Sequence, residues 1–467
     1  MSSTELTLNY TNVLSRAIGD DNGLSSDEFK AEMPAITRAF ESARKALPAW
    51  GFTTLPRKTE RAKAIITLAD SLAARCDDFV VIGIGGSALG NITLQTSLNP
   101  PFYNLMTRVA RGNRPRIHVP DNIDPVLISN LLSTLDPGKT VVNVIAKSGK
   151  TSETLSNFLI FKDFLEKRLG PAWKNQVVIT TDPENGPLRA LAEELDILTL
   201  DVPPDVGGRF SVLSPVGLLS AAVAGISITE VLAGADEMLA RCSQAAWDKN
   251  PAFYSAVIHY LYDVRKNIRM SVLMPYAQSL RDIADWFRQI WAESLGKRID
   301  RQGKEVFCGL TPIKALGATD QHSQIQLYAE GPVDKLITFI HVDSFGTETV
   351  IPAAFSDKPD IAYLGSKTLN ELLHAEEYAT RAALTKAGRP SLTISLPEIS
   401  ARTIGRLLMF FELQTAYAGE LYDINAFDQP GVEQGKIFTS ALMGREGFTE
   451  ARTELEQMNL SDPECSI

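Results

Sequence analysis

The chain has 467 residues, of which 44% are hydrophobic and 22% are charged. Because this length exceeds one typical domain of about 150 residues and the apolar share can fill a large core, global disorder and a small stapled scaffold are excluded. The net charge of -10 argues against a nucleic acid or an anionic membrane as partner, since no overall basic field would attract either one.

The cysteines and the N-terminus indicate a cytoplasmic protein. The four cysteines lie far apart and form no CxxC or zinc spacing, so we expect free thiols and no structural metal. The first ten residues contain neither a cationic nor a long apolar region, so they do not resemble a secretory signal. The charge-free stretch 210–229 is long enough to span a membrane, but Pro215 and the helical spacing of its leucines predict a buried helix instead.

The first half of the chain alternates between helices and short β-branched runs. Apolar residues at helical spacing predict a helix over 34–47 that begins at Pro34, and Thr59 is expected to cap a second helix that runs to Cys76. Strands alternating with helices predict a parallel, doubly wound sheet. The expected strands are 79–84, 116–119, 141–145 and 176–180.

A second series of the same kind follows residue 251. Its expected strands are 268–274, 336–342 and 391–395, and its expected helices are 276–295, 366–386 and 398–418. The repeated alternation predicts an α/β protein with two doubly wound sandwich subdomains and mainly parallel sheets. We expect an N-terminal helical segment (1–50) packing on the second subdomain, a first subdomain (51–250), a second subdomain (251–445) and a C-terminal helix and tail (446–467).

The loop 83–90, with the sequence GIGGSALG, joins an expected strand to a helix. Its glycines, Gly86 among them, let the backbone approach a ligand, while the Ser87 hydroxyl and the helix N-terminus favour an anion. The loop also fits a loose dinucleotide fingerprint, but the nearest acidic residue at a strand end, Asp121, is too far along the chain. A tight turn without a ligand is the remaining alternative.

The loop 146–154 also lies between a strand and a helix, and it contains Lys147, Ser148 and Thr151. A Walker A motif is rejected because Val144 stands where that motif requires glycine. Cations and hydroxyls at the start of a helix indicate a phosphate cradle, with an ordinary polar helix cap as the alternative. The presence of two such loops in one sheet favours phosphate.

Four further groups contain residues that could react. Arg209 lies in the Gly-rich stretch 207–211, and Gln289 and Glu293 are spaced to share one helix face. His322 follows Asp320 and Gln321, and Lys436 ends the stretch 428–436. Taken singly, each has an ordinary structural interpretation, such as a surface ion pair or a solvated helix face.

Taken together, these motifs resemble the phosphoglucose isomerase family from about residue 50 to about residue 445. The matching stretches are 83–90, Lys147–Ser148 with Thr151 and Glu153, 181–183, 207–211, Glu293–Ser294, 320–322 and 429–436. The resemblance implies two sugar-isomerase (SIS) subdomains and reversible conversion of glucose 6-phosphate to fructose 6-phosphate through an enediolate. It also implies that no metal or organic cofactor is needed.

The same resemblance implies a role for each matching residue. Glu293 would be the base, Arg209 would face the enediolate, and His322 would open the sugar ring with help from Lys436. The residues implied to hold the substrate are Gly86, Ser87, Lys147, Ser148, Thr151, Glu153, Gln289 and Gln429. Since the histidine reaches the site from a neighbouring subunit in this family, a homodimer or larger homo-oligomer is implied.

Two positions depart from the family's pattern. Ala146 stands where a serine is common, and Lys150 stands where a threonine is common. The loop therefore lacks one hydroxyl that could contact the phosphate. A non-catalytic SIS sugar-phosphate sensor would need the two loops but not Glu293, His322 and Lys436, and an isomerase that also accepts mannose 6-phosphate would share all of these residues.

Overall fold

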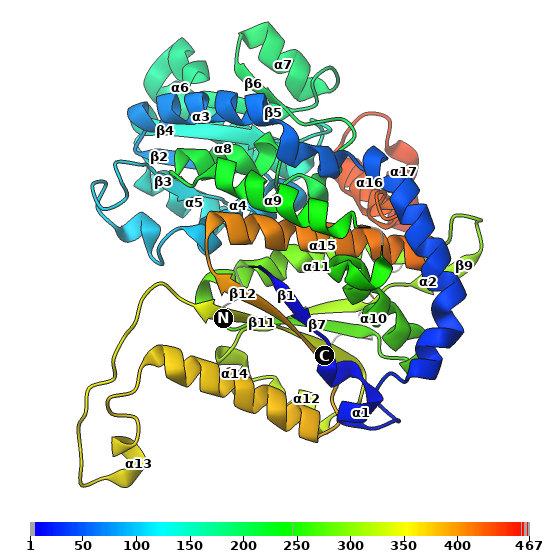
Figure 1. Cartoon of the computed structure of the whole chain (residues 1–467). Coiled ribbons are helices and arrows are strands. Elements are labelled where there is room, and N and C mark those ends of the chain that lie inside the picture. Colours follow the sequence, from blue (N-terminus) through cyan, green and yellow to red (C-terminus); the bar gives the residue numbers. More distant parts are fainter. Residues whose placement is uncertain (1–4, 245, 459, 462–464, 466–467) are drawn as a thin grey trace. The chain divides into compact units, whose positions relative to one another are not determined.

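The computed structural model describes residues 5–244, 246–458, 460, 461 and 465. The chain divides into two compact units, Met1–Ala426 and Phe427–Ile467. Among its described residues, the first unit contains two five-stranded sheets. Figure 1 shows these two sheets on either side of a layer of helices that includes α9, α11 and α15.

The first sheet has the strand order β3-β2-β4-β5-β6, and every neighbouring pair in it is parallel. The central strands are buried on both faces, because α-helical crossovers cover a parallel sheet. The strands are β2 (Asp78–Ile82), β3 (Arg116–His118), β4 (Thr140–Ile145), β5 (Val177–Thr181) and β6 (Leu198–Asp201). The helices of this half are α3 (Thr59–Arg75), α4 (Leu89–Leu98), α5 (Pro125–Thr134), α6 (Ser152–Leu169), α7 (Pro187–Leu195), α8 (Pro215–Val223) and α9 (Ile228–Cys242).

The second sheet has the order β1-β12-β11-β7-β10, and only the N-terminal strand runs antiparallel to its neighbour. Its strands are β1 (Thr7–Asn9), β7 (Met270–Pro275), β10 (Thr311–Lys314), β11 (Lys335–Ser344) and β12 (Ser391–Glu398). Its helices are α10 (Pro251–Lys266), α11 (Arg281–Leu295), α12 (Ile325–Glu330), α13 (Pro359–Ala362), α14 (Leu369–Lys386) and α15 (Ala401–Leu421). A short antiparallel pair, β8 (Lys297–Ile299) with β9 (Glu305–Cys308), follows α11. The predicted α/β class with mainly parallel sheets is confirmed.

The N-terminal segment differs from the prediction in where its helices begin. After the short helix α1 (Ser15–Ile18), helix α2 (Ser26–Ala46) starts at a capping box in which the Ser25 hydroxyl and the Glu28 carboxylate each accept the other's backbone N–H. Pro34 lies inside this helix and does not begin it. Thr59 is the first residue of α3, and no side chain caps that helix, so the predicted cap is wrong.

Most of the charge-free stretch 210–229 is buried, as predicted, but it is not one helix. Helix α8 is buried over its whole length, the chain turns at Gly225, and α9 begins at Ile228. Within the described residues, no helix is both long enough and apolar enough to cross a membrane.

Helices α9 and α15 pack so closely that their backbones nearly touch, and a glycine makes this possible. A Cβ atom on Gly405 would lie 1.9 Å from the carbonyl oxygen of Val231 in α9, so no larger residue fits there without separating the helices. The N-terminal segment packs against elements of the second half, since β1 pairs with β12 and Phe40 lies edge-on to Phe253 at 4.9 Å. These contacts support the proposed placement of that segment, whose boundary remains a prediction.

In the described part of the second unit, the helices α16 (Glu433–Leu442) and α17 (Thr449–Gln457) follow the short turn η12 (Pro430–Val432). Most of its described side chains are exposed, and Ala441 is a buried exception.

His259 in α10 is a fully buried neutral histidine behind helix α11. Its Nδ1 lies 2.8 Å from the carbonyl oxygen of Ser255, its Nε2 lies 3.1 Å from Ser271 Oγ, and its ring packs on Trp291 with centroids 5.1 Å apart. Burial lowers the pKa of His259 from its ordinary value of 6.5 to about 4, against the opposing effect of the bond to Ser255.

We therefore expect His259 to make stability depend on pH. Because the unfolded chain takes up the proton first, this contribution is fully present above pH 6.5 and is lost as pH falls toward 4. Between roughly pH 7 and pH 5, His259 should lower the free energy of unfolding by about 2 kcal/mol. His259→Gln should remove this pH dependence. Urea unfolding at both pH values checks this, and an equal pH dependence in both proteins would contradict it.

Candidate active site

The first loop lies directly against the segment that contains Arg209. Strand β2 ends at Ile82, and the chain then forms the turn η4 (Gly85–Ser87) before α4. A Cβ atom on Gly86 would lie 2.3 Å from both the carbonyl carbon and oxygen of Gly208, in the turn η8 (Gly208–Phe210). Gly86 is therefore required for this close backbone contact, whether or not the loop binds a ligand.

Arg209 connects this segment to helix α11. Its guanidinium is buried, and its Nε donates to Ser294 Oγ at 2.7 Å while its Nη2 donates to the Ala426 carbonyl oxygen at 2.7 Å. Its Nη1 forms an ion pair with Glu293 Oε2 at 3.3 Å. Three groups thus fix one cation beside the carboxylate of Glu293.

Glu293 is oriented by its own helix. Gln289 Nε2 donates to Glu293 Oε1 at 2.9 Å, which confirms that the two residues share one helix face. The buried Lys297 donates its Nζ to the Glu293 carbonyl oxygen at 2.6 Å, and α11 ends at Leu295, before Gly296. About 33% of the Glu293 side chain is exposed, so a ligand can reach a carboxylate that is already aimed.

The first loop also approaches Gln289. A Cβ atom on Gly85 would lie 2.9 Å from Gln289 Nε2, and the Gln289 Oε1 atom is buried without a hydrogen-bond partner among the described residues. The structure therefore brings together the loop 83–90, Arg209, Gln289 and Glu293. Buried polar atoms without partners are uncommon, and this one is suited to accept a hydrogen bond from a ligand hydroxyl.

The second loop follows β4, which pairs with β2, so both loops lie at the carboxyl ends of neighbouring parallel strands. Lys147 Nζ donates to the carbonyl oxygens of Pro204 at 2.6 Å and Val206 at 2.9 Å. Burial lowers the pKa of Lys147, although Asp182 and Asp205 act in the opposite direction. An ammonium has three donors, so these carbonyls orient the cation and leave it able to bind an anion.

The other residues of this loop are more open. The Ser148 hydroxyl accepts the Lys150 backbone N–H at 3.2 Å, and both side chains are exposed. Thr151 is the N-cap residue of α6 but makes no side-chain capping bond, and Glu153 lies half-buried in the first turn. The hydroxyls of Ser148 and Thr151 thus remain available at a helix N-terminus. Ala146 is buried, so it presents no polar group in place of a serine.

His322 is exposed in the turn η11 (Thr319–His322), and its ring makes no hydrogen bond or ion pair within the described part of the chain. Its neighbour Gln321 is fixed, since it accepts from the Tyr276 hydroxyl at 2.6 Å and donates to Glu376 at 2.7 Å. The turn is therefore anchored through Gln321, and the imidazole of His322 points outward from it.

Gln429 and Lys436 belong to the second unit. There Lys436 Nζ donates to Glu433 Oε1 at 2.7 Å, and both side chains are exposed. The roles implied for Gln429 and Lys436 stay predictions.

Two residues that fix Arg209 and Glu293 in place were not predicted from the sequence. Ser294 binds Arg209, and Lys297 binds the carbonyl of Glu293. The spacing of four residues between Glu293 and Lys297 was the available signal, but it is also typical of a solvated helix face. No cluster of three His, Cys, Asp or Glu side chains suited to a metal ion occurs within the described ranges.

Comparisons with known proteins show which sequences and structures this chain resembles. The sequence pattern of the family Phosphoglucose isomerase matches residues 70–454. A glucose-6-phosphate isomerase of Carboxydothermus hydrogenoformans is 51% identical over 406 residues, which is 87% of each chain. Another, of Rubrobacter xylanophilus, is 44% identical over 449 residues, or 95% of this chain and 99% of that one. The crystal structure of a hypothetical protein from Thermus thermophilus is 37% identical, with a TM-score of 0.82, and the match covers 94% of this chain and 100% of that one.

The contact between Gly86 and Gly208 can be tested by stability. Gly86→Ala should lower the free energy of unfolding by about 1–3 kcal/mol, because its methyl group would force the two segments apart. Gly208→Ala is the matched control, since nothing lies within 4 Å of its Cβ position. Chemical unfolding of both variants checks this, and equal losses would show that the close approach does not matter.

Proposed function

The chain belongs to the phosphoglucose isomerase family, and we propose that it interconverts glucose 6-phosphate and fructose 6-phosphate, the isomerisation used in glycolysis and gluconeogenesis. The observation that carries the proposal is the Glu293 carboxylate held between Gln289 and Arg209 beside the first loop. An aldose becomes a ketose when a proton leaves the carbon next to the carbonyl and returns one carbon away. A single aimed carboxylate can make both transfers.

Arg209 provides the electrostatic part of this proposal. Removal of the carbon-bound proton leaves negative charge on the substrate oxygens, and a fixed buried cation stabilises that charge without reorganising. Comparable preorganised donors contribute roughly 3–4 kcal/mol to the transition state. The bonds of Arg209 to Ser294 and Ala426 fix the guanidinium while its Nη1 edge faces Glu293.

The substrate phosphate is assigned to the two loops at the strand ends. Lys147 supplies the cation, while Ser87, Ser148 and Thr151 supply hydroxyls near helix N-termini. Gly86 allows the loop to pass close to Arg209, and Glu153 and Gln429 are proposed to contact the sugar. On this assignment the phosphate anchors the sugar, and the anchored sugar brings its C1 and C2 atoms to Glu293.

Ring opening is assigned to His322 with help from Lys436. A neutral imidazole can take the proton of a ring hydroxyl and return one to the ring oxygen near neutral pH. The ring of His322 is exposed and makes no hydrogen bond to the described residues, which is consistent with delivery to the site of a second subunit. We therefore propose a homodimer or larger homo-oligomer.

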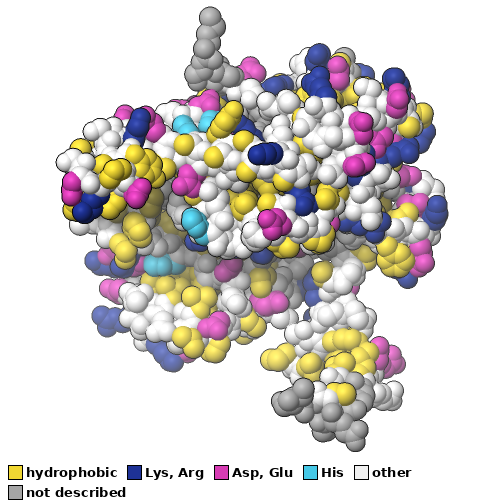
Figure 2. Space-filling view, turned by 90° about the horizontal axis from the view of Figure 1, so that it is seen from below, with side chains coloured by type: hydrophobic (Ala, Val, Ile, Leu, Met, Phe, Trp, Pro, Cys, Tyr) yellow, Lys and Arg dark blue, Asp and Glu magenta, His cyan; other side chains and the backbone are white. Residues whose placement is uncertain are grey.

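An exposed apolar segment supports that assembly. Residues 345–368 leave the end of β11 and project from the second sheet before returning to α14 (Figure 1). The segment exposes Val350, Phe355, Ile361 and Tyr363 by 59%, 60%, 49% and 68%. Figure 2 shows hydrophobic side chains gathered at the left edge of the lower face, where this segment lies. Apolar groups gathered this way typically bury against a partner. The four cysteines, all of them free, fit the proposed cytoplasmic location.

The proposed reaction can be assayed directly. Purified protein should form fructose 6-phosphate from glucose 6-phosphate at a kcat of order 1–10³ per second, without added metal or cofactor. Mannose 6-phosphate, assayed beside it, distinguishes a strict isomerase from a dual one. Binding of sugar phosphates without turnover of either would instead indicate a sensor.

The phosphate assignment predicts that Lys147→Ala raises KM for glucose 6-phosphate at least tenfold, because a charge-assisted contact of about 1.5–3 kcal/mol is lost. Inorganic phosphate should compete with substrate in the wild type and lose this effect in the variant. Lys150→Ala, which removes an exposed cation from the same loop, is the matched control and should change KM little. Similar KM values for wild type and Lys147→Ala would contradict the assignment.

The assignment of His322 predicts a selective defect. His322→Ala should slow turnover of cyclic glucose 6-phosphate far more than turnover of an analogue that lacks the hydroxyls needed to close a ring. Steady-state kinetics with both substrates measures the ratio. Equal losses on the two substrates would place His322 in the isomerisation step or in the folding of its turn.

A further inference from the structure

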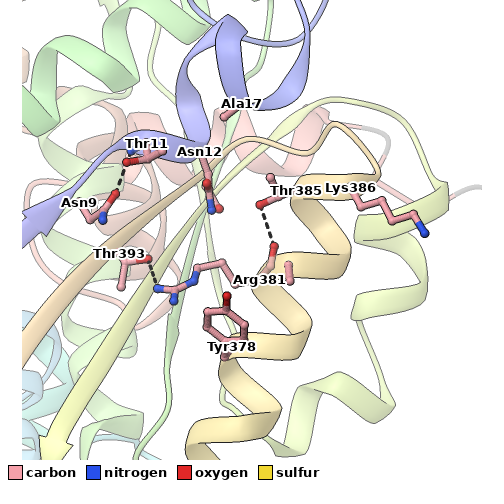
Figure 3. Close-up of a pocket in the computed structure, with 11 residues that line it drawn as sticks. Asn9, Thr11, Asn12, Ala17, Tyr378, Arg381, Thr385, Lys386 and Thr393 are labelled. Atoms are coloured by element: carbon pink, nitrogen blue, oxygen red, sulfur yellow. Dashed lines mark hydrogen bonds between the residues drawn. The ribbon is translucent and has the colours of Figure 1, made fainter.

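A cavity of about 510 Å³ lies between the N-terminal segment, helix α14 and strand β12 (Figure 3). Its volume falls in the range of about 300–1,000 Å³ that is typical of small-molecule sites. None of its lining residues belongs to the isomerase site proposed above. Its polar lining includes Asn9, Asn12, Arg381, Lys386, Ser391 and Thr393.

Arg381 is the central charged group of this cavity. Figure 3 shows its side chain extending from α14 between Asn12 and Tyr378 toward Thr393 on β12. Its Nη1 donates to the Thr393 hydroxyl at 3.0 Å, and its guanidinium carbon lies 5.6 Å from the centre of the Tyr378 ring. These contacts hold the planar fork, while its Nε and Nη2 make no hydrogen bond to the described residues. A guanidinium that is fixed in place and has free N–H groups is suited to bind a phosphate or a carboxylate.

The charge of the cavity wall favours an anion. Two cations, Arg381 and Lys386, line the described wall, and no carboxylate lines it, although the whole chain carries a net charge of -10. Arg381 Nη1 forms an ion pair with the buried Glu377, whose Oε1 lies 3.6 Å away and whose Oε2 is hydrogen-bonded to His341, while the Nε and Nη2 edge stays open to a ligand. Figure 3 shows the Lys386 ammonium pointing away from Arg381, so Lys386 acts at the rim.

The remaining wall is rich in hydroxyl and amide groups. Ser391 is 2% exposed, and its hydroxyl has no hydrogen-bond partner within the described residues. Asn9 Oδ1 accepts the Thr11 backbone N–H at 2.9 Å, which leaves the Asn9 amide donors available. A buried hydroxyl without a partner on a cavity wall is best satisfied by a polar ligand.

We propose that this cavity is a second binding site, separate from Glu293, for a small phosphorylated polyol. The phosphate binds the free edge of Arg381, and ligand hydroxyls bind Ser391 and the asparagine amides. A cavity of 510 Å³ is far larger than inorganic phosphate needs, whereas it can take a phosphate that carries a sugar-sized polyol.

The test counts binding sites with glucitol 6-phosphate, a hexose phosphate without a carbonyl that cannot be isomerised. Equilibrium titration of the full chain by calorimetry should give two sites per chain. Arg381→Gln should weaken one of them at least about tenfold and leave kcat and KM for glucose 6-phosphate unchanged. Lys147→Ala should weaken only the other one.

Two further variants keep the test decisive if Arg381→Gln folds poorly. Asn12→Asp retains Arg381 but adds a negative charge to the wall, and it should remove the same site. Arg265→Gln, which removes an arginine paired with Glu32 elsewhere, should retain both sites. One site per chain in the wild type, or two undiminished sites in both Arg381→Gln and Asn12→Asp, would overturn the proposal. The first of these results is also expected if a second copy of the chain covers the cavity.

Discussion

The buried guanidinium of Arg209 is the interaction on which the site depends. A charge removed from water is retained only when it is paired and hydrogen-bonded, and Arg209 meets this condition through Glu293, Ser294 and the Ala426 carbonyl. These partners lie on α11 and at the end of the first unit, whereas Arg209 itself lies in the turn η8 after the first sheet. The buried charge of Arg209 is therefore compensated inside the protein. The same contacts connect the loops of the first sheet to α11, the helix that presents Glu293.

Close backbone packing makes this arrangement possible. Gly86 lets the first loop lie against Gly208, and Gly405 lets α15 approach α9. In both places a methyl group would collide with backbone, which cannot move aside as a flexible side chain can. The close packing of these helices and loops holds Arg209 and Glu293 in a fixed geometry, which a proton transfer between adjacent carbons requires.

The sequence was informative where one local pattern determined the structure. The β-branched runs located β2, β4, β5 and β11 within a few residues, and the four-residue spacing of Gln289 and Glu293 predicted the face they share. Local rules failed where tertiary contacts decided the outcome. One local signal was overlooked, because α2 begins at the capping box of Ser25 and Glu28 and Pro34 lies inside the helix.

Short strands and partner residues were also beyond local rules. Strands β1, β8 and β10 have three or four residues each, too few for a periodic pattern. Strands β1 and β10 exist through pairing with the distant strands β12 and β7, and β8 pairs with the nearby β9. The roles of Ser294 and Lys297 depend on which groups face them after folding. The resemblance to the family supplied roles for conspicuous residues, while the structure alone shows which neighbours hold Arg209 and Glu293 in place.

The central claim is that Glu293, aimed by Gln289 and Arg209, carries the proton between C1 and C2. The most direct measurement follows deuterium incorporation at C2 by NMR in heavy water, with Glu293→Gln compared to wild type and Glu153→Gln as control. We predict that wild type and Glu153→Gln exchange the C2 hydrogen, while Glu293→Gln binds an open-chain sugar acid phosphate but loses exchange by orders of magnitude. Deuterium uptake by Glu293→Gln at the wild-type rate would mean that another group removes the proton.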